Sequence, residues 1–192
     1  RDAAAPRRPV RAGGAAALTR TVRLRLIPKP GKSGARPLGV GEPVVTVAKR
    51  IAFDTLCDAT SGWLEERGQW GVRTSDGCRR LAAAVGACWE DGWSVAGLDV
   101  HNAFNSVHRR PVVEMVQRLC PELAPFVAFS LQETTLMGEG KVVRVNRGVV
   151  QGDPMSPLLF ALVMGDVAET VVEECRRRGT KFRRIFGARH QH

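Results

Sequence analysis

The segment GLDVHNAFNSV, Gly97–Val107, contains one acid and one bulky ring among smaller side chains, Asp99 and Phe104. A carboxylate at the end of an apolar strand is costly to hold there unless it binds a partner. Asp99 would suit a hard divalent cation such as Mg²⁺, and the backbone from Val100 to Ala103 could present further groups to the same ligand. The ring of Phe104, packed beside a sugar, would exclude an additional hydroxyl. The alternative is an aspartate that only caps a helix or ends a turn.

A second segment whose residues could bind a ligand is RGVVQGDPMSPLLFALV, Arg147–Val163. Gly148 and Gly152 would let the backbone approach a ligand closely, and Gln151 offers both hydrogen-bond donors and acceptors. Ser156-Pro157 then begins a long apolar helix, whose N-terminus favours an anion. An ordinary turn into a helix is the alternative.

Two further segments carry basic side chains beside turns. RLIPKPGKSGARPLGV places Lys29, Lys32 and Arg36 around a Gly/Pro tip, where they could clamp a triphosphate. A solvated loop is the alternative for this hairpin. GQWGVRTSDG, Gly68–Gly77, sets an aromatic ring between glycines with Arg73 nearby. It could contact a nucleic-acid backbone or be a tight turn, and the sequence does not separate these two interpretations.

The positive charge is concentrated near the N-terminus. The formal net charge is +10, and residues 1–50 hold 12 Lys and Arg against 2 Asp and Glu. A second basic run without acids, RRRGTKFRR, spans residues 176–184. Such blocks favour a polyphosphate partner, because each neutralised phosphate releases counterions. A solvated disordered arm is the alternative for residues 1–20.

The compartment is indicated by the cysteines and by the lack of long apolar runs. The five cysteines form no C-x-x-C pair and have no His at ligand spacing, so we expect reduced, mostly buried thiols and no zinc site. This pattern fits a nuclear or cytoplasmic protein. No run approaches eighteen apolar residues, so no membrane partner is expected. The chain begins with Arg1 rather than Met, as an excised or incomplete reading frame would.

The elements that must position these residues follow from periodicity and from turn residues. Alternation predicts a hairpin of two strands at 21–27 and 36–40. A short buried strand is expected at 93–100, with Asp99 at its end, and another strand at 141–146. Ser156 is expected to N-cap the last helix, with Pro157 at its first position. Helices are predicted at 44–57, 76–90, 109–120, 121–132 and 156–175. The order indicates a mixed α/β protein without repeats.

Four segments in order make the chain resemble the reverse transcriptase domain of non-LTR retrotransposons: PKPGKSGARPLGV, GQWGVRTSDG, LDVHNAFNSV and RGVVQGDPMSPLLFALV. The resemblance covers about residues 22–170. QGDPMSPLLFALVM is most similar to the site-specific clade that carries a restriction-like endonuclease. Trypanosomatid elements inserted at spliced-leader genes are one candidate group. An intron maturase or telomerase-type polymerase is a related alternative, although NAFNSV and DPMSPLLF fit the retrotransposon pattern better.

The resemblance implies an α/β (α+β) right-hand polymerase fold, of which this chain would supply the fingers and part of the palm. It implies an RNA template, a DNA primer and deoxynucleoside triphosphates as partners. The catalytic aspartate would be Asp99, which with Val100 would bind two Mg²⁺ ions for in-line nucleotidyl transfer. The implied segments are a basic disordered linker at 1–20, a partial reverse transcriptase domain at 21–175 and a basic degenerate tail at 176–192.

The resemblance also implies a nucleotide-binding set. Phe104 would be the aromatic gate that selects deoxyribonucleotides. Gln151 and Gly152 would pack against the incoming nucleotide, and Lys29 and Arg36 would hold its triphosphate.

One part of the family pattern is missing. The family has a Phe/Tyr-x-Asp-Asp hairpin a few tens of residues after the QG loop, and its aspartates complete the metal site. After Gln151 this chain offers only Asp153 and Asp166, neither in an Asp-Asp pair. Two cations need several anionic ligands. We therefore expect a truncated or frameshifted reverse transcriptase that is inactive alone.

Two other classes of function compete with this expectation. One is a non-catalytic RNA-binding relic that uses the basic N-terminal region and tail. The other is an unfolded relic, because Leu98 and the apolar helix after Pro157 would lack packing partners and expose apolar surface.

Overall fold

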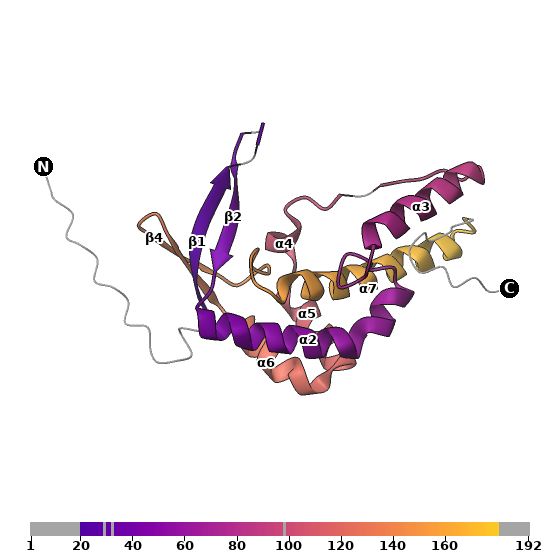
Figure 1. The fold of residues 1–192 in the computed structure, drawn as a ribbon. Helices are drawn as coiled ribbons and strands as arrows, with labels where there is room; N and C mark the ends of the chain where they lie inside the picture. The colour runs from indigo at the N-terminus through magenta and orange to yellow at the C-terminus, as the bar shows by residue number, and fades with distance from the viewer. Residues whose placement is uncertain (1–19, 29, 32, 98, 181–192) are drawn as a thin grey trace, which may run out of the picture.

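A computed structural model describes residues 20–180 apart from positions 29, 32 and 98. One mixed four-stranded sheet lies at one end of this region, and helices extend from it to α3 at the other end (Figure 1). The strands are β1 (Thr21–Pro28), β2 (Ala35–Val40), β3 (Thr134–Gly138) and β4 (Lys141–Val145). Their order is β2-β1-β3-β4, so the two hairpins meet at a β1–β3 pair.

The two hairpins are antiparallel, whereas β1 and β3 run parallel. Alternation along β1 separates the faces of the sheet, since Val22 is buried while Arg23 and Arg25 are exposed. The buried face packs toward the helices and the loop that follows β4.

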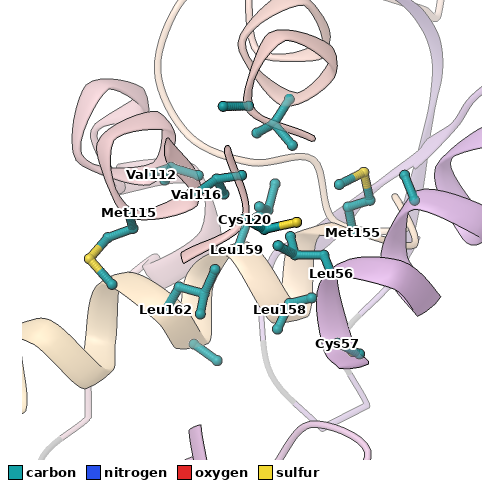
Figure 2. Packing of buried hydrophobic residues seen from close by; sticks show 14 of the residues in the cluster. Leu56, Cys57, Val112, Met115, Val116, Cys120, Met155, Leu158, Leu159 and Leu162 are labelled. Carbon is teal, nitrogen blue, oxygen red and sulfur yellow. The ribbon is translucent and has the colours of Figure 1, made fainter. Parts of the chain in front are cut away.

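The described helices, all but α3, contribute residues to one hydrophobic core. The helices are α2 (Pro43–Glu66), α3 (Gly77–Glu90), α4 (Ala103–Ser106), α5 (Arg109–Leu119), α6 (Ala124–Ser130) and α7 (Ser156–Arg177), with a 3-10 turn η1 (Pro121–Leu123) before α6. Leu56 of α2, Val112 and Val116 of α5, and Leu158 and Leu162 of α7 are completely buried. Figure 2 shows these side chains converging from three helices. Complete burial of such a side chain contributes about 1.5–3 kcal/mol.

Most of the expected elements are confirmed. The basic hairpin, the strand at 141–146 and all the predicted helices form, although α2 continues to Glu66 and the helix expected at 121–132 divides into η1 and α6. The α/β (α+β) class is therefore confirmed at the level of a mixed sheet with helices. Sequence reasoning missed β3, whose polar residues Thr134 and Thr135 and short length of 5 residues gave little periodic signal.

The prediction of a buried strand at 93–100 is wrong. The described residues of this segment lie outside helices and strands, and Trp93, Val95 and Val100 are 37%, 37% and 42% exposed. A strand is stable only when a neighbour pairs its backbone groups. The edge strands of the sheet are β2 and β4, and the described residues of this segment pair with neither of them. Leu98 lies outside the described residues.

The expected N-cap of the last helix is off by one residue. Met155 occupies the cap position, so Ser156 is the first helical residue and Pro157 the second. The hydrogen bond at this end comes from Asp153 instead, whose Oδ1 accepts the backbone N–H of Met155 at 2.9 Å. The shift has little cost, since Pro157 still lies in the first turn, where an N–H is not needed.

The cysteines follow the expected pattern in part. Cys57, Cys88 and Cys120 are buried, Cys78 is exposed and Cys175 is intermediate, and all are free thiols. None of the described helices is long and apolar enough to cross a membrane.

Candidate active site

The loop between β4 and α7 is fastened to the segment that carries Phe104. Three hydrogen bonds connect them: Gly148 N–H to the Val107 carbonyl at 2.9 Å, Val149 N–H to the Phe104 carbonyl at 2.7 Å, and Arg147 Nε to the Ser106 carbonyl at 2.7 Å. The aromatic residue and the glycine-containing loop, over 40 positions apart, therefore form one unit.

Gly148 is required at this junction by geometry. Its φ is +78°, and a Cβ there would lie 2.6 Å from the carbonyl oxygen of Asn105. Any larger side chain would therefore collide with backbone while also adopting a left-handed conformation.

The same loop reaches the basic hairpin on its other side. The N–H of Gly39 in β2 donates to the Gln151 carbonyl at 2.7 Å. Gly152 has a φ of +103°, and a Cβ there would lie 2.5 Å from the Gly39 carbonyl oxygen. Arg36 lies three residues before Gly39 on the same strand and is exposed. The structure thus brings the strand of Arg36, the Gln151-Gly152 turn and the Phe104 segment around one loop.

The ring of Phe104 is held at the beginning of α7. Its centroid lies 5.2 Å from that of Phe160, with the planes tilted by 30°. This is a favourable separation for an aromatic pair. Phe104 is half-buried and packs against the hydrophobic core, so its position is fixed from two sides.

A cavity of about 250 Å³ lies between the sheet and this loop. Its wall includes Gln151 and also Asn105, the residue that follows Phe104 in the sequence. The size approaches the lower end of small-molecule sites. Its walls also include Leu24, Pro37, Gly39, Leu136 and Arg147.

Lys49 and Asp153 form an ion pair beneath the loop that sequence reasoning did not foresee. Their side chains are 12% and 15% exposed, so the pair is shielded from water. Asp153 also accepts the N–H of Met155 at the beginning of α7, where a negative charge is favoured by the helix dipole. The pair connects α2 to the loop that holds Gln151.

The side chain of Arg109 holds several segments of this region together through hydrogen bonds. Sequence reasoning did not predict this role. Its buried guanidinium donates to four backbone carbonyls and one hydroxyl, and no carboxylate of the described residues pairs with it. Burial lowers the pKa of Arg109 below its ordinary value. In the sequence it looked like any exposed arginine at a helix start. Its acceptors are the carbonyls of Gly148 (2.8 Å), Leu131 (3.2 Å), Gln132 (2.7 Å) and Val145 (3.1 Å), and Thr134 Oγ1 (3.2 Å).

The predicted metal ligands are not brought together with other ligands. Asp99 and Val100 are exposed and lie outside the helices and strands. Asp153 is paired with Lys49, and Asp166 with Arg118 at 2.9 Å. No group of three or more His, Cys, Asp or Glu among the described residues could hold a metal ion. The carboxylates present in this part of the chain therefore do not fit a two-metal site.

Two other segments were predicted from the sequence to carry binding residues, the basic hairpin tip and residues 68–77. Lys29 and Lys32 lie outside the described residues. Arg73 has a φ of +53° and pairs with Asp54 and Asp58 of α2 at 3.3 and 3.4 Å. Its charge is thus satisfied within the fold, which favours a tight turn for residues 68–77.

An apolar groove of about 670 Å³ runs between α5 and α7. Val100, the residue that follows Asp99, is one of its lining residues. Its apolar lining includes Val107, Met115, Phe160, Val163, Met164 and Val167.

Comparison with known proteins adds a sequence relationship. Over 165 residues the chain is 30% identical to the "Retrovirus-related Pol polyprotein from type-1 retrotransposable element R2" of Nasonia vitripennis. It is 34% identical over 83 residues to the protein of the same description from Popillia japonica. The chain is related to retrotransposon Pol polyproteins. No protein-family profile matches it.

The similarity covers a limited part of these relatives. The aligned region is 77% of this chain but 16% of the Nasonia polyprotein, and 39% and 12% for the Popillia polyprotein. The chain spans about a sixth of the length of the Nasonia polyprotein, and less of the Popillia one. The expected relationship to retrotransposons is confirmed, whereas the clade, the spliced-leader group and the role of each site residue stay predictions.

Proposed function

We propose that this chain is the fingers and partial palm of an RNA-directed DNA polymerase, which adds deoxynucleotides to a primer 3′-end. The observation that supports this most strongly is the double attachment of the loop at 147–152. The loop bonds to the Phe104 carbonyl on one side and receives the N–H of Gly39 on the other. Three predicted nucleotide-binding elements, far apart in sequence, therefore lie around one loop.

Each residue has a role in this proposal that its chemistry supports. Arg36, with Lys29, holds the triphosphate of a deoxynucleotide, because a guanidinium binds phosphate oxygens in pairs. Phe104 excludes the 2′-hydroxyl of a ribonucleotide, and its pairing with Phe160 keeps the ring in place. Gln151 and Gly152 contact the base and sugar from the turn. An RNA template and a DNA primer complete the set of partners.

The metal chemistry is incomplete in this proposal. In the family that the chain resembles, two Mg²⁺ ions lower the pKa of the primer hydroxyl and stabilise the leaving pyrophosphate. Asp99 with the Val100 carbonyl would be one ligand set, but Asp153 and Asp166 are paired with Lys49 and Arg118. We therefore propose that the chain binds nucleotide and is inactive in polymerisation by itself.

Nucleotide binding tests the first part of this proposal. Isothermal titration of the full chain should give binding of dTTP and at least about tenfold weaker binding of ribothymidine triphosphate, which differs only by its 2′-hydroxyl, equivalent to about 1.4 kcal/mol. Phe104→Ala should reduce this preference, while Phe129→Ala, which removes a ring elsewhere, should not. Equal binding of both nucleotides by the unaltered chain would exclude a sugar gate at Phe104.

Primer extension tests the second part. On a homopolymer RNA template with Mg²⁺, the chain should incorporate no deoxynucleotide. Incorporation that is abolished in Asp99→Ala would contradict the proposed inactivity and would assign catalysis to Asp99.

The second candidate is a non-catalytic RNA-binding protein that uses the basic N-terminal region and tail. The charge asymmetry favours it, because 12 basic residues lie within residues 1–50. Comparison of RNA affinity at several salt concentrations, with and without residues 1–20, distinguishes the two. Loss of all RNA binding on that deletion, together with an absence of dTTP binding, would favour this candidate. Nuclear or cytoplasmic residence and a site-specific parent element are further parts of our proposal.

A further inference from the structure

The strand register gathers four arginines on the open face of the sheet. Arg23 and Arg25 alternate with Val22 and therefore point away from the buried face. Arg36 pairs with Ile27 of β1, and Arg144 pairs with Thr135 of β3, which places both on the same face. The four residues come from three strands and are all exposed.

This face lies opposite the candidate nucleotide cavity. Leu24, Gly39, Leu136 and Val145, which line that cavity, occupy the alternate positions of the same strands. A ligand on Arg23, Arg25 and Arg144 would therefore leave the cavity free, and also Arg36, which the proposed function assigns to the triphosphate. The two surfaces can be tested separately.

The charge of the face is poorly neutralised. Arg23 lies 3.8 Å from Glu42 and Arg144 lies 3.7 Å from Glu133, and these side chains are 43–63% exposed. Exposed pairs at such distances contribute little and are easily replaced by another anion. Arg25 and Arg36 form no ion pair with any residue that the structure describes.

The arrangement is too wide for one phosphate group. Arg23 and Arg25 are two positions apart on β1, about 6.7 Å along the strand. Arg144 lies on β4, two strand spacings from β1, about 9.5 Å. Three exposed apolar side chains lie in the same row as Arg23, since Val40, Met137 and Val142 share its register position. They are 44%, 44% and 58% exposed.

We propose that this open face of the sheet binds the phosphodiester backbone of a nucleic acid through Arg23, Arg25 and Arg144, while Arg36 keeps its role in the proposed nucleotide site. Several separated guanidinium groups match a chain of phosphates, and each contact would release counterions. The apolar side chains in the row of Arg23 can contact sugars and bases. This surface is additional to the nucleotide site, and its binding is independent of the sequence of the nucleic acid.

The test uses the full chain and a fluorescent 20-nucleotide RNA in anisotropy titrations between 50 and 200 mM salt. The triple variant R23Q/R25Q/R144Q leaves Arg36 of the nucleotide site intact. Three lost contacts should reduce the slope of log affinity against log salt by about 2, which makes the fall in affinity over this range about 20-fold smaller. The matched control R50Q/R79Q/R110Q removes the same charge from exposed helix positions and should keep the original slope within about 0.5.

Further measurements separate the outcomes. An unchanged slope in R23Q/R25Q/R144Q, or an equal reduction in both triple variants, would overturn the proposal. So would binding to anionic phospholipid vesicles that depends on these arginines while RNA binding does not. Single-stranded DNA of the same length identifies which nucleic acid is preferred. Titration with dTTP should be unaffected in R23Q/R25Q/R144Q, so failure of the proposed polymerase function is recognised independently.

Discussion

The backbone N–H of Val149 donates a 2.7 Å hydrogen bond to the carbonyl of Phe104. This bond connects the loop before α7 to the short helix α4. It makes the position of the aromatic ring depend on the backbone of a segment more than 40 residues later. Substitutions in the loop should therefore affect stability and site geometry together.

Gly148→Ala should destabilise the fold strongly. The new Cβ would lie 2.6 Å from the Asn105 carbonyl oxygen at a φ of +78°. We expect a loss of about 2–4 kcal/mol in the free energy of unfolding, measured by urea denaturation. Gly71→Ala is the control, because a Cβ there has no atom within 4 Å. A loss below about 1 kcal/mol for Gly148→Ala would show that the junction adapts.

Arg109→Met should cost about 3–5 kcal/mol of stability, because four buried or part-buried hydrogen bonds to carbonyls and the one to the Thr134 hydroxyl are lost. Arg109→Lys should recover only part of this, since one ammonium cannot reproduce the planar fork. The neighbouring Arg110→Met removes only an exposed pair with Glu114 and should change stability by less than about 1 kcal/mol. Thermal or urea unfolding checks the order of the three. Similar losses of stability for Arg109→Met and Arg110→Met would contradict the stabilising role of the Arg109 hydrogen bonds.

The Lys49–Asp153 pair should show coupling in a double-mutant cycle. Lys49→Met, Asp153→Asn and the double variant should give an interaction free energy of about 1–3 kcal/mol, because the pair is mostly shielded from water. Asp153→Ala should cost more than Asp153→Asn, since it also removes the acceptor of the Met155 N–H. A coupling near zero would mean that the two residues contribute independently.

The cysteines should differ in reactivity and in their effect on alkaline stability. Burial raises the pKa of Cys57 and of Cys120, whereas Cys78 is exposed. Because the thiolate is the reactive form, iodoacetamide should modify Cys78 first, as peptide mass spectrometry would show. The raised pKa stabilises the fold below the ordinary thiol value of about 8.5, and this contribution is lost as pH rises above it.

Urea unfolding between pH 7 and 10 checks the alkaline effect. Cys57→Ala should reduce the decline of stability across this range, and Cys78→Ala should leave it unchanged. Rapid modification of Cys57 in the folded chain would contradict its burial.

The sequence by itself determined the local elements and the relationship to retrotransposons. The elements follow from local signals, which depend only on neighbouring residues. These signals are the alternation in residues 21–27, the helical spacing in the segments of α2, α5 and α7, and the Gly/Pro turns. The motif order around Phe104 and Gln151 likewise indicated a relationship that the comparisons confirmed.

Only the tertiary structure decided how the site is assembled. Three sets of contacts join residues more than 20 positions apart, and no local pattern specifies such partners. They are the β1–β3 pair, the hydrogen bonds of Arg109 and the Lys49–Asp153 pair. The strand expected at 93–100 shows the converse. Its apolar composition favoured a strand, but a strand exists only where another strand pairs with it, and the sheet provides none at that position.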